Sequence, residues 1–438
     1  AFVSCDSNYL TLCVLELECG SKMKKVYIWL FAAFPFHSIA EERDYFSLSI
    51  DELLDIQIIE TASGYEQKIK DSPASASVIL REEWEAMGAT DLYEALSSVA
   101  GVHVGLDTSI LETSTIIIRG LGSTGTQVKV LVDGIPFNDR TRAEVKSVGR
   151  LPLHGFERIE IVRGPGSVLH GADAFAGTIN LVSEPAGSET NNRVFMGAGK
   201  DKLRGGSFSY GGEYKGINWY VSAQLESSGN TGRRVEVDAQ TFLDLAPFSG
   251  LTPPASHAPG PLQDWYDVEN IIVKANHDNL SAEILNWQLT SGMHLGVTDR
   301  IDNPNNPVSQ VKQTQRSVKL NYVPDVSVPG TLELELLYDY SYEDNDFMVF
   351  PAGSVVLVGD DGNLFSAGAY PAVLIDDGLF THTGMNNETI SFKVNHIFVT
   401  HDVHQIRWEA GYENNELDAE FIRMFGPGVT DAITLPRP

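Results

Sequence analysis

From about residue 187 onward, apolar and polar residues alternate along the chain with a period of two. Ile217, Trp219 and Val221 fall on one face of an extended chain, and Asn218 and Ser222 fall on the other. Similar segments lie near residues 193–200, 204–214, 217–226, 267–276, 280–290, 314–323, 331–342, 387–399 and 405–413. Such alternation is typical of strands with one buried face. The pattern therefore predicts a large antiparallel sheet in this part of the chain.

Two arrangements of such a sheet remain open, a soluble sandwich and a membrane barrel, because both alternate apolar and polar faces. The strands are long, charges lie on the polar face, and aromatic residues end the apolar face. Connections also alternate between short turns, at 214–216 and 277–279, and long polar loops, at 227–266 and 343–385. Long strands, aromatic girdles and alternating loop lengths favour the barrel.

Residues 71–186 have a different pattern of apolar and polar positions, which predicts a small α/β unit. Strands are expected at 77–80, 115–119, 128–133, 158–163 and 176–182. Thr90 or Asp91 can cap a helix whose apolar face holds Leu92, Leu96 and Val99, and Gly101 can end it. This stretch has the length of one small domain.

Composition narrows the class of protein. Lys and Arg number 31 and Asp and Glu 59, so the net charge is −28, and hydrophobic residues make up 42% of the chain. This apolar content excludes wholesale disorder. The acidity argues against nucleic acid as a partner, because phosphate binding needs a basic face. No apolar run reaches the roughly 20 residues of a membrane-spanning helix, which excludes a helical membrane protein.

The amino-terminal region resembles an export signal. Met23 precedes two lysines, residues 26–36 are apolar, and Ser38, Ile39 and Ala40 follow. We therefore expect a signal peptide at 23–40, with residues 1–22 as upstream sequence that is not native. A buried core helix or strand is the alternative. Cys5, Cys13 and Cys19 all precede Met23, so a mature chain starting near Glu41 has no cysteine.

A search for catalytic or metal-binding motifs finds none. Residues 120–125 fit G-x-G-x-x-G, but a strand rather than a helix is expected to follow, so no dinucleotide site is predicted. His401 and His404 would face opposite sides of a strand, and Asp360-Asp361-Gly362 reads as a turn. We expect no enzyme activity, no metal and no cofactor.

Two arginines end apolar strands and precede glycine, Arg119 and Arg163. One such arginine would ordinarily be a solvated strand end. Two matched cases suggest a shared docking role, since the guanidinium group suits bidentate pairing with carboxylates.

Three motifs in order resemble the plug of TonB-dependent outer-membrane receptors. They are TIIIRGLGS at 115–123, VKVLVDGIPFND at 128–139 and FERIEIVRGPGSVLHGADAFAGTINLVS at 156–183. The resemblance implies a mainly β fold, in which a small α/β plug domain precedes an antiparallel transmembrane β-barrel. The family's barrel has 22 strands, and residues 187–438 suffice for about nine or ten. We therefore expect a chain truncated at the C-terminus, with a complete plug and part of the barrel.

The resemblance also implies a function. It implies active uptake of a scarce nutrient across the outer membrane of a Gram-negative bacterium, driven by the TonB complex, with outer-membrane lipid around the barrel. The nutrient class is an iron chelate, haem or cobalamin, with a ferric siderophore or other iron chelate as the first expectation. The alternatives are a passive porin or adhesin-type barrel and a soluble secreted β-rich protein.

Candidate site residues follow from matching the motifs of the family. Within the periplasmic segment 41–70, the TonB-box candidate is Asp55, Ile56, Gln57, Ile58, Ile59, Glu60 and Thr61, although any extended linker could look the same. The expected plug–barrel pairing joins Arg119 and Arg163 with Glu409 and Glu413. The plug structural glycines are Gly120, Gly134, Gly164, Gly166, Gly171 and Gly177. The ligand-binding candidates at the plug apices are Gly122, Ser123, Thr124, Asn138, Arg140 and Arg142.

Overall fold

The computed structural model describes residues 58–61, 67–69, 72, 74–107, 113–121, 127–139, 150–171, 173–188, 192–245, 253–295, 298–357, 372–400 and 404–425. All of them belong to one compact unit, Leu48–Pro438. The expected upstream stretch 1–22 and signal peptide 23–40 lie outside the described residues. Among the described residues, no helix has both the length and the apolar character to cross a membrane.

A five-stranded sheet organises the plug region, residues 71–186. Its order is β3-β8-β9-β6-β7, and the strands are β3 (Ser75–Leu80), β6 (Val128–Val132), β7 (Ile135–Pro136), β8 (Phe156–Arg163) and β9 (Gly177–Ser183). β6 and β9 run parallel, and the other neighbours are antiparallel. Every residue of β6 is buried, as expected for a parallel strand covered on both faces.

Two short sheets accompany this one. β4 (Val102–Asp107) pairs with β5 (Thr113–Ile118), and the two-residue strands β1 (Ile58–Ile59) and β2 (Gln67–Lys68) pair with each other. Strands predicted at 77–80, 115–119, 128–133, 158–163 and 176–182 are all present, with bounds shifted by one to two residues at most ends.

Within the described part of the plug region there are three short helices, α2 (Arg81–Met87), α3 (Leu92–Leu96) and α4 (Ser167–His170). The Asp91 carboxylate accepts a hydrogen bond from the Glu94 backbone N–H at 2.9 Å, which confirms the predicted cap of α3. The helix ends at Leu96, one turn earlier than predicted. α2 was not predicted; it ends where Gly88 adopts a left-handed φ of 75°.

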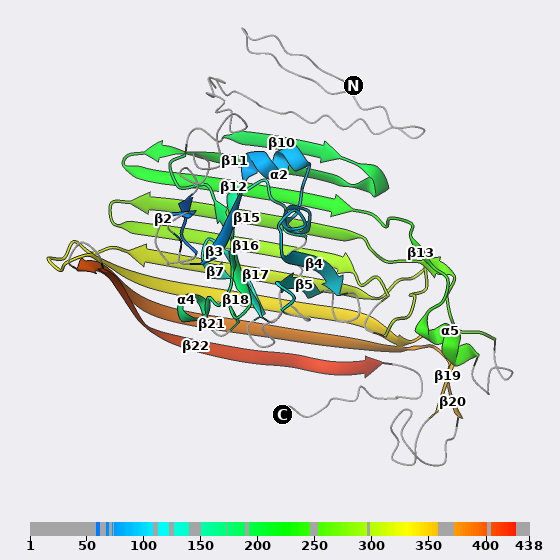
Figure 1. Ribbon diagram of the computed structural model, residues 1–438. Coiled ribbons are helices and arrows are strands. Elements are labelled where there is room, and N and C mark those ends of the chain that lie inside the picture. The colour runs from blue at the N-terminus through cyan, green and yellow to red at the C-terminus, as the bar shows by residue number, and fades with distance from the viewer. Residues whose placement is uncertain are drawn as a thin grey trace, which may run out of the picture. The chain divides into compact units, whose positions relative to one another are not determined.

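Nine antiparallel strands form the large sheet of the described residues (Figure 1). They are β10 (Arg193–Ala198), β11 (Arg204–Tyr214), β12 (Ile217–Ser228), β15 (Tyr266–His277), β16 (Leu280–Gly292), β17 (Gln310–Tyr322), β18 (Thr331–Phe350), β21 (Leu379–Thr400) and β22 (His404–Phe425). Their spatial order is their order along the chain, as short hairpins and long loops require. The nine predicted segments match these nine strands one to one.

Three of these strands are longer than predicted by eight residues or more. β18 has 20 residues, and β21 and β22 have 22 each. The sequence placed a long loop at 343–385, whereas Asp344 pairs with Gly384 and Asn345 with Thr383. Residues there are polar on both faces, so the alternation disappears although the backbone pairing continues. The prediction of a loop at these positions was wrong for that reason.

The two faces of the large sheet differ in kind. Directly paired residues share a face. One such row joins Ile284, Val318, Tyr338 and Ile390, whose side chains are 47%, 39%, 39% and 51% exposed. We call this exposed apolar side the outward face. The opposite side, which we call the inward face, carries buried residues such as Trp287, and these pack against the plug region.

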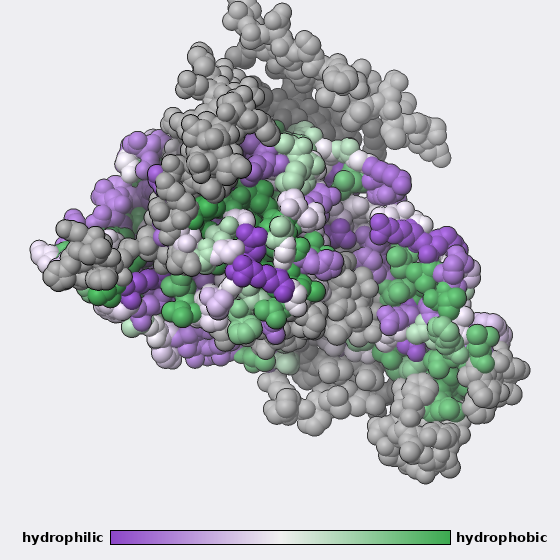
Figure 2. Space-filling model, in the orientation of Figure 1, coloured by the Kyte–Doolittle hydropathy of each residue, from purple (hydrophilic) through white to green (hydrophobic). Residues whose placement is uncertain are grey.

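The long connections fold into a cluster at one end of the sheet. It contains β13 (Arg234–Val235), α5 (Ala239–Asp244), β14 (Gly260–Pro261), β19 (Ser354–Leu357) and β20 (Ala372–Ile375). Asp238, which caps α5, accepts hydrogen bonds from Ser256 Oγ at 2.7 Å and from the Ile301 backbone N–H at 3.0 Å. The Arg300 guanidinium lies 4.6 Å from the centre of the Phe350 ring. Hydrophobic residues gather around α5 and β19 (Figure 2). A single-turn 3-10 helix, Lys200–Lys202, joins β10 and β11.

Candidate functional site

A buried carboxylate holds the segment predicted as the TonB box. Glu160 on β8 is 0% exposed, and its Oε2 accepts hydrogen bonds from the backbone N–H of Glu60 at 3.1 Å, the backbone N–H of Thr61 at 2.9 Å and Thr61 Oγ1 at 2.5 Å. Ile59 beside them is fully buried. We call these contacts the Glu160 clasp. Asp55, Ile56 and Gln57 of the candidate lie outside the described residues.

Two further groups complete the clasp. Arg158 Nε binds Glu160 Oε1 at 2.9 Å, so both carboxylate oxygens have partners. His170 Nε2 lies 2.8 Å from the Thr61 carbonyl oxygen, which can only accept, so this nitrogen carries the proton. Burial holds the pKa of His170 below its usual range, which favours the neutral ring. Thr61 is therefore held from both sides by the plug.

A second buried cluster joins the plug to the large sheet. Asp133, in the turn between β6 and β7, binds Lys274 Nζ at 2.8 Å and accepts from Ser183 N and Oγ at 2.8 and 2.7 Å. Lys319 donates to the Asp133 backbone carbonyl and pairs with Glu283 at 3.2 Å. We call this the Asp133 mooring. Burial opposes the charge, but Lys274 and Lys319 hold the pKa of Asp133 below its usual range.

An apolar contact lies beside the mooring. Phe137 of the plug meets Trp287 of β16 edge to face, with ring centres 5.0 Å apart. Both belong to one buried cluster that also contains plug residues such as Val130 and sheet residues such as Ile272 and Leu285. Plug and sheet therefore share a single hydrophobic core.

A third contact lies near the end with long loops. The Arg150 guanidinium is 4.1 Å from the centre of the Tyr266 ring, and Tyr266 donates to Glu226 Oε1 at 2.5 Å. Asp91 lies in the same group of charges, and burial raises its pKa to about 7. This carboxyl therefore titrates near neutral pH.

The predicted plug–barrel arginines make other contacts. Arg163 donates to the carbonyl oxygens of Ala100 and Ala76 and to Ser77 Oγ, all within the plug. Arg119 is exposed at the end of β5. Glu409 and Glu413 pair with inward-facing residues of β21, as the alternation predicted, and Glu409 binds Arg407 at 3.2 Å. Pairing between these arginines and glutamates stays a prediction.

The predicted glycines occupy positions where the backbone angle or a close neighbour disfavours a side chain. Gly120, Gly134, Gly164 and Gly171 have φ angles of 77°, 79°, 144° and 85°. A Cβ added to Gly177 would lie 2.5 Å from the Val162 carbonyl oxygen, and one added to Gly166 would lie 2.8 Å from Thr178 Oγ1. Each position therefore disfavours a larger residue.

Of the ligand-binding candidates, Asn138 alone is described. It is 2% exposed, accepts from the Val130 N–H at 2.8 Å and donates to the Val128 carbonyl at 2.9 Å. These bonds assign it a structural part in the β6–β7 turn. Gly122, Ser123, Thr124, Arg140 and Arg142 lie outside the described residues, so their role stays a prediction.

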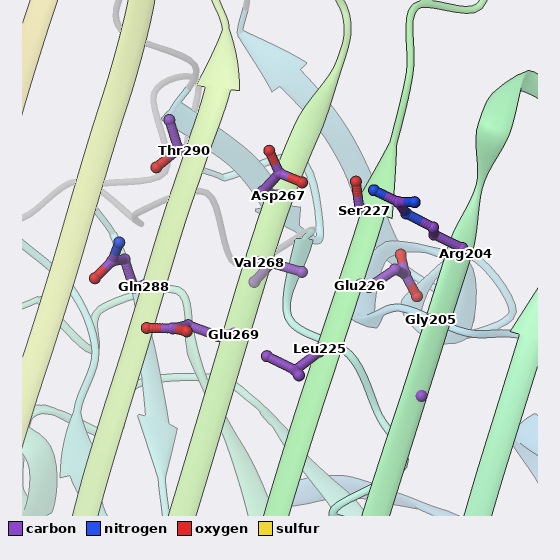
Figure 3. A pocket seen from close by; sticks show the side chains of 11 residues that line it. Arg204, Gly205, Leu225, Glu226, Ser227, Asp267, Val268, Glu269, Gln288 and Thr290 are labelled. Atoms are coloured by element: carbon purple, nitrogen blue, oxygen red, sulfur yellow. The ribbon is translucent and has the colours of Figure 1, made fainter. Parts of the chain in front are cut away.

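Two other features lie on the outward face. Asp344, Asp346 and His382 form the one described trio spaced for a metal ion, with His382 Nδ1 lying 3.3 and 2.9 Å from the carboxylate oxygens of Asp344 and Asp346. A groove of about 450 Å³ crosses β11, β12, β15 and β16 (Figure 3). Leu225, Asp267 and Glu269 line it from the side opposite the plug, so it is not a path through the sheet.

Sequence reasoning missed the Asp133 mooring and the Glu160 clasp. A signal for the mooring was available, because Lys274 and Glu283 place charges on strand faces where apolar residues such as Ile272 and Leu285 alternate with them. Their partner on the plug could not be read from the sequence, since 141 residues separate Asp133 from Lys274.

Comparison with known proteins gives consistent matches. Residues 68–178 match the family model of the TonB-dependent receptor plug domain. The chain is 34% identical over 152 residues to a vitamin B12 transporter of Vibrio vulnificus, covering 35% of this chain and 24% of that protein. It is 36% identical over 180 residues to an iron-regulated outer membrane virulence protein of Vibrio cholerae, covering 40% and 26%. The matched stretches thus span about a quarter of these relatives.

Solved structures extend the likeness to the large sheet. The unliganded ferric citrate transporter FecA matches with a TM-score of 0.56 at 13% identity, over 83% of this chain and 50% of that one. The outer-membrane receptor for pyoverdine from Pseudomonas aeruginosa, with pyoverdine bound, matches with a TM-score of 0.52 at 14% identity, over 84% and 50%. At this identity the likeness establishes the fold, a plug with part of a β-barrel.

Proposed function

Because its plug domain and its sheet make this chain a TonB-dependent receptor, we propose that it serves the active uptake of a scarce nutrient across the outer membrane. Its location is the outer membrane of a Gram-negative bacterium. The nutrient that we propose is a ferric siderophore or another iron chelate. The names of the relatives support this class, since they include an iron-regulated protein and a ferric citrate transporter, while the vitamin B12 transporter supports cobalamin as the second candidate.

The Asp133 mooring is the observation that carries the proposal. A passive pore needs an open lumen, whereas here the plug shares a core and a buried ion cluster with the inward face. Moving such a plug needs an external source of energy. The extended segment at Ile58–Thr61 is bound by the clasp and by a two-residue pairing, and such a segment offers a partner a strand to grip. That partner is the TonB complex.

Uptake by cells tests the proposal. The receptor carrying this chain would be expressed in a strain without other TonB-dependent receptors. Cells would be offered radiolabelled ferric citrate, a ferric hydroxamate, a ferric catecholate and cyanocobalamin. We expect accumulation of one iron chelate, lost when TonB is deleted or a protonophore is added. Accumulation that survives both treatments would instead identify a passive barrel, and accumulation of cyanocobalamin alone would replace iron by cobalamin.

A further inference from the structure

Three side chains that can each bind a metal ion meet on the outward face of two neighbouring strands. Asp344 and Asp346 lie on β18, and His382 lies on β21, directly opposite Asp346. His382 Nδ1 is 2.9 Å from Asp346 Oδ1 and 3.3 Å from Asp344 Oδ1. We call these three residues the β18–β21 trio. It belongs neither to the Glu160 clasp nor to the Asp133 mooring, because its side chains face away from the plug.

The backbone brings the members of the trio together. Asp344 and Asp346 are two positions apart in one strand, so they point to the same side, which is that of Tyr338 in the outward row. The residue opposite Asp344 is Gly384, which has no side chain, so the imidazole of His382 can approach Asp344 as well. Sequence spacing did not reveal the trio, since 36 residues separate Asp346 from His382.

The distances within the trio suit a first-row divalent cation. Zn²⁺ binds imidazole nitrogen and carboxylate oxygen at about 2.0–2.2 Å, so neighbouring ligand atoms of a tetrahedral or octahedral site lie about 2.8–3.6 Å apart. Both distances from His382 Nδ1 fall in this range, and the three ligand atoms lie within 4.8 Å of one another. One imidazole with two carboxylates also suits such an ion better than Ca²⁺, which takes about six to eight oxygen ligands.

One oxygen of the trio has no donor. Asp344 Oδ1 is shielded from solvent, although its side chain as a whole is 27% exposed, and no described hydrogen bond reaches this atom. His382 Nδ1 can carry a single hydrogen, and Asp346 Oδ1 at 2.9 Å is its nearer acceptor. A carboxylate oxygen that is shielded from water without a donor or a cation is unfavourable. A cation between the three ligand atoms would satisfy it.

The surroundings of the trio hold one carboxylate in place and leave room for a hydrated ion. Gln310 Nε2 donates to Asp346 Oδ2 at 3.0 Å, which leaves Asp346 Oδ1 for the ion. A pocket of about 380 Å³ lined by Asp346 and His382 opens beside the trio, so water can take the coordination positions that the protein does not fill. Lys312 lies opposite Asp344 on β17, but no described ion pair joins these two residues.

We propose that the β18–β21 trio binds a first-row divalent cation, with Zn²⁺ held more tightly than Co²⁺ or Mn²⁺. Asp344 Oδ1, Asp346 Oδ1 and His382 Nδ1 are the protein ligands, and Gln310 positions the Asp346 carboxylate. Binding releases the proton of Nδ1 and joins β18 to β21 where the connection between them leaves the sheet. The ion is a structural component and not cargo. The site goes beyond the proposed uptake and does not depend on it.

Metal titration of the purified receptor tests the site. The receptor carrying this chain is purified in detergent without a histidine tag and stripped of metal with a chelator, which is then removed. Co²⁺ is added first, because its visible absorption reports the number and type of its ligands. Zn²⁺, Mn²⁺, Mg²⁺ and Ca²⁺ are then tested by displacement of Co²⁺.

Variants on both strands are compared with matched controls. His382→Gln removes the ligand on β21, and Asp346→Asn weakens a ligand on β18. The control for the first is His277→Gln, because the exposed imidazole of His277 lies 3.6 Å from a single carboxylate, that of Asp278. The control for the second is Asp267→Asn, an exposed carboxylate in the groove of Figure 3.

We expect the wild type and both controls to bind a single Co²⁺ ion, which Zn²⁺ displaces and an equal concentration of Mg²⁺ or Ca²⁺ does not. His382→Gln and Asp346→Asn should weaken binding about tenfold or more, and Gln310→Ala about tenfold. Equal binding in all variants would place the ion elsewhere in the receptor and overturn the proposal. Absence of Co²⁺ and Zn²⁺ binding to the wild type would overturn it as well, and would leave the trio a hydrogen-bonded cluster.

Thermal unfolding gives a second readout. Saturating Zn²⁺ should raise the Tm of the wild type and leave the Tm of His382→Gln unchanged. Equal Tm values of the two proteins in chelator show that the variant folds. Uptake by cells is measured with the same variants, and we expect His382→Gln to transport at the wild-type rate. Loss of uptake in the folded variant would overturn the purely structural part of the ion, whereas loss of uptake in the wild type would concern the proposed function alone.

Discussion

At the residue scale, the chain places charges in buried positions and pairs them. Asp133 adopts a left-handed φ of 49°, which turns its carboxylate toward Lys274. Asp and Asn tolerate this backbone conformation better than most residues do. Lys274 and Asp133 have side chains that are 15% and 4% exposed, so neither charge is well hydrated. Each therefore depends on the other.

We predict that Asp133→Asn destabilises the receptor by about 3 kcal/mol, because a buried ammonium group loses its counter-ion. Asparagine keeps the left-handed turn, so the effect reports the charge. Thermal unfolding of the detergent-purified receptor measures it. Asp278→Asn is the matched control, since Asp278 also has a positive φ of 50° but a side chain 84% exposed. Adding Lys274→Met to Asp133→Asn should recover part of the loss; no recovery would argue against the ion pair.

Asp91 gives a prediction about pH. Its pKa is about 7 in the folded protein because of burial, against 3.8 for a free carboxyl, so the folded state binds more protons between these values. The contribution of Asp91 to the free energy of unfolding therefore falls as pH rises from about 4 to 7. Asp91→Asn keeps a capping oxygen and removes the titration. We expect the variant to be more stable than the wild type at pH 8.5 by about 1 kcal/mol or more, roughly 2–4 °C in Tm. The difference should shrink at pH 5.5.

Exposed Asp325 supplies the control for this experiment, since it lies in the connection between β17 and β18. Asp325→Asn should leave Tm unchanged at both pH values. A stabilisation by Asp91→Asn that is equal at pH 5.5 and 8.5 would mean that the charge of Asp91 is not its cause.

At the scale of elements, the sequence predicted the strands and their faces well. Alternation placed Trp219 and Ile217 on one face and Ser222 and Gln224 on the other, and both pairs behave so. The prediction from alternation failed where strand pairing continues although neither face is apolar, as at Asp344 and Asn345 of β18. It could not locate the clasp either, because Glu160 reads as an ordinary polar position of strand β8. Its partners Glu60 and Thr61 lie about 100 residues away along the chain.

We predict that Glu160→Ala releases the segment that contains Ile59. The variant loses the acceptor for three donors of Glu60 and Thr61, so the segment separates more often from β8. Reaction of Ile59→Cys with a maleimide measures this opening, and we expect a rise of about tenfold. Glu157→Ala is the control, because Glu157 also binds Arg158, at 3.1 Å, without touching the segment. Equal rates in both variants would contradict the clasp.

At the scale of the whole molecule, the proposed function places the outward face against lipid. The row of Ile284, Val318, Tyr338 and Ile390 lies between more polar ends of the strands. We predict that Ile284→Arg costs about 2–4 kcal/mol of folding free energy, as expected for a charge near the bilayer midplane. Urea titration of the receptor refolded in phospholipid vesicles measures it. Leu280→Arg at the short turn of the same strand should cost about 0–1 kcal/mol. Equal costs at both positions would place the bilayer elsewhere on this face.

The cluster formed by the long connections has a consequence for engineering. Asp238 of the first connection is bonded to Ile301 of the second, and Arg300 of the second covers Phe350, where the third begins. A single loop transplanted from another receptor would leave a carboxylate or a guanidinium group without its neighbour. The side chains of the three loops therefore depend on one another, and the loops form one structural unit. Attempts to change the selectivity of the receptor by grafting should move all three together.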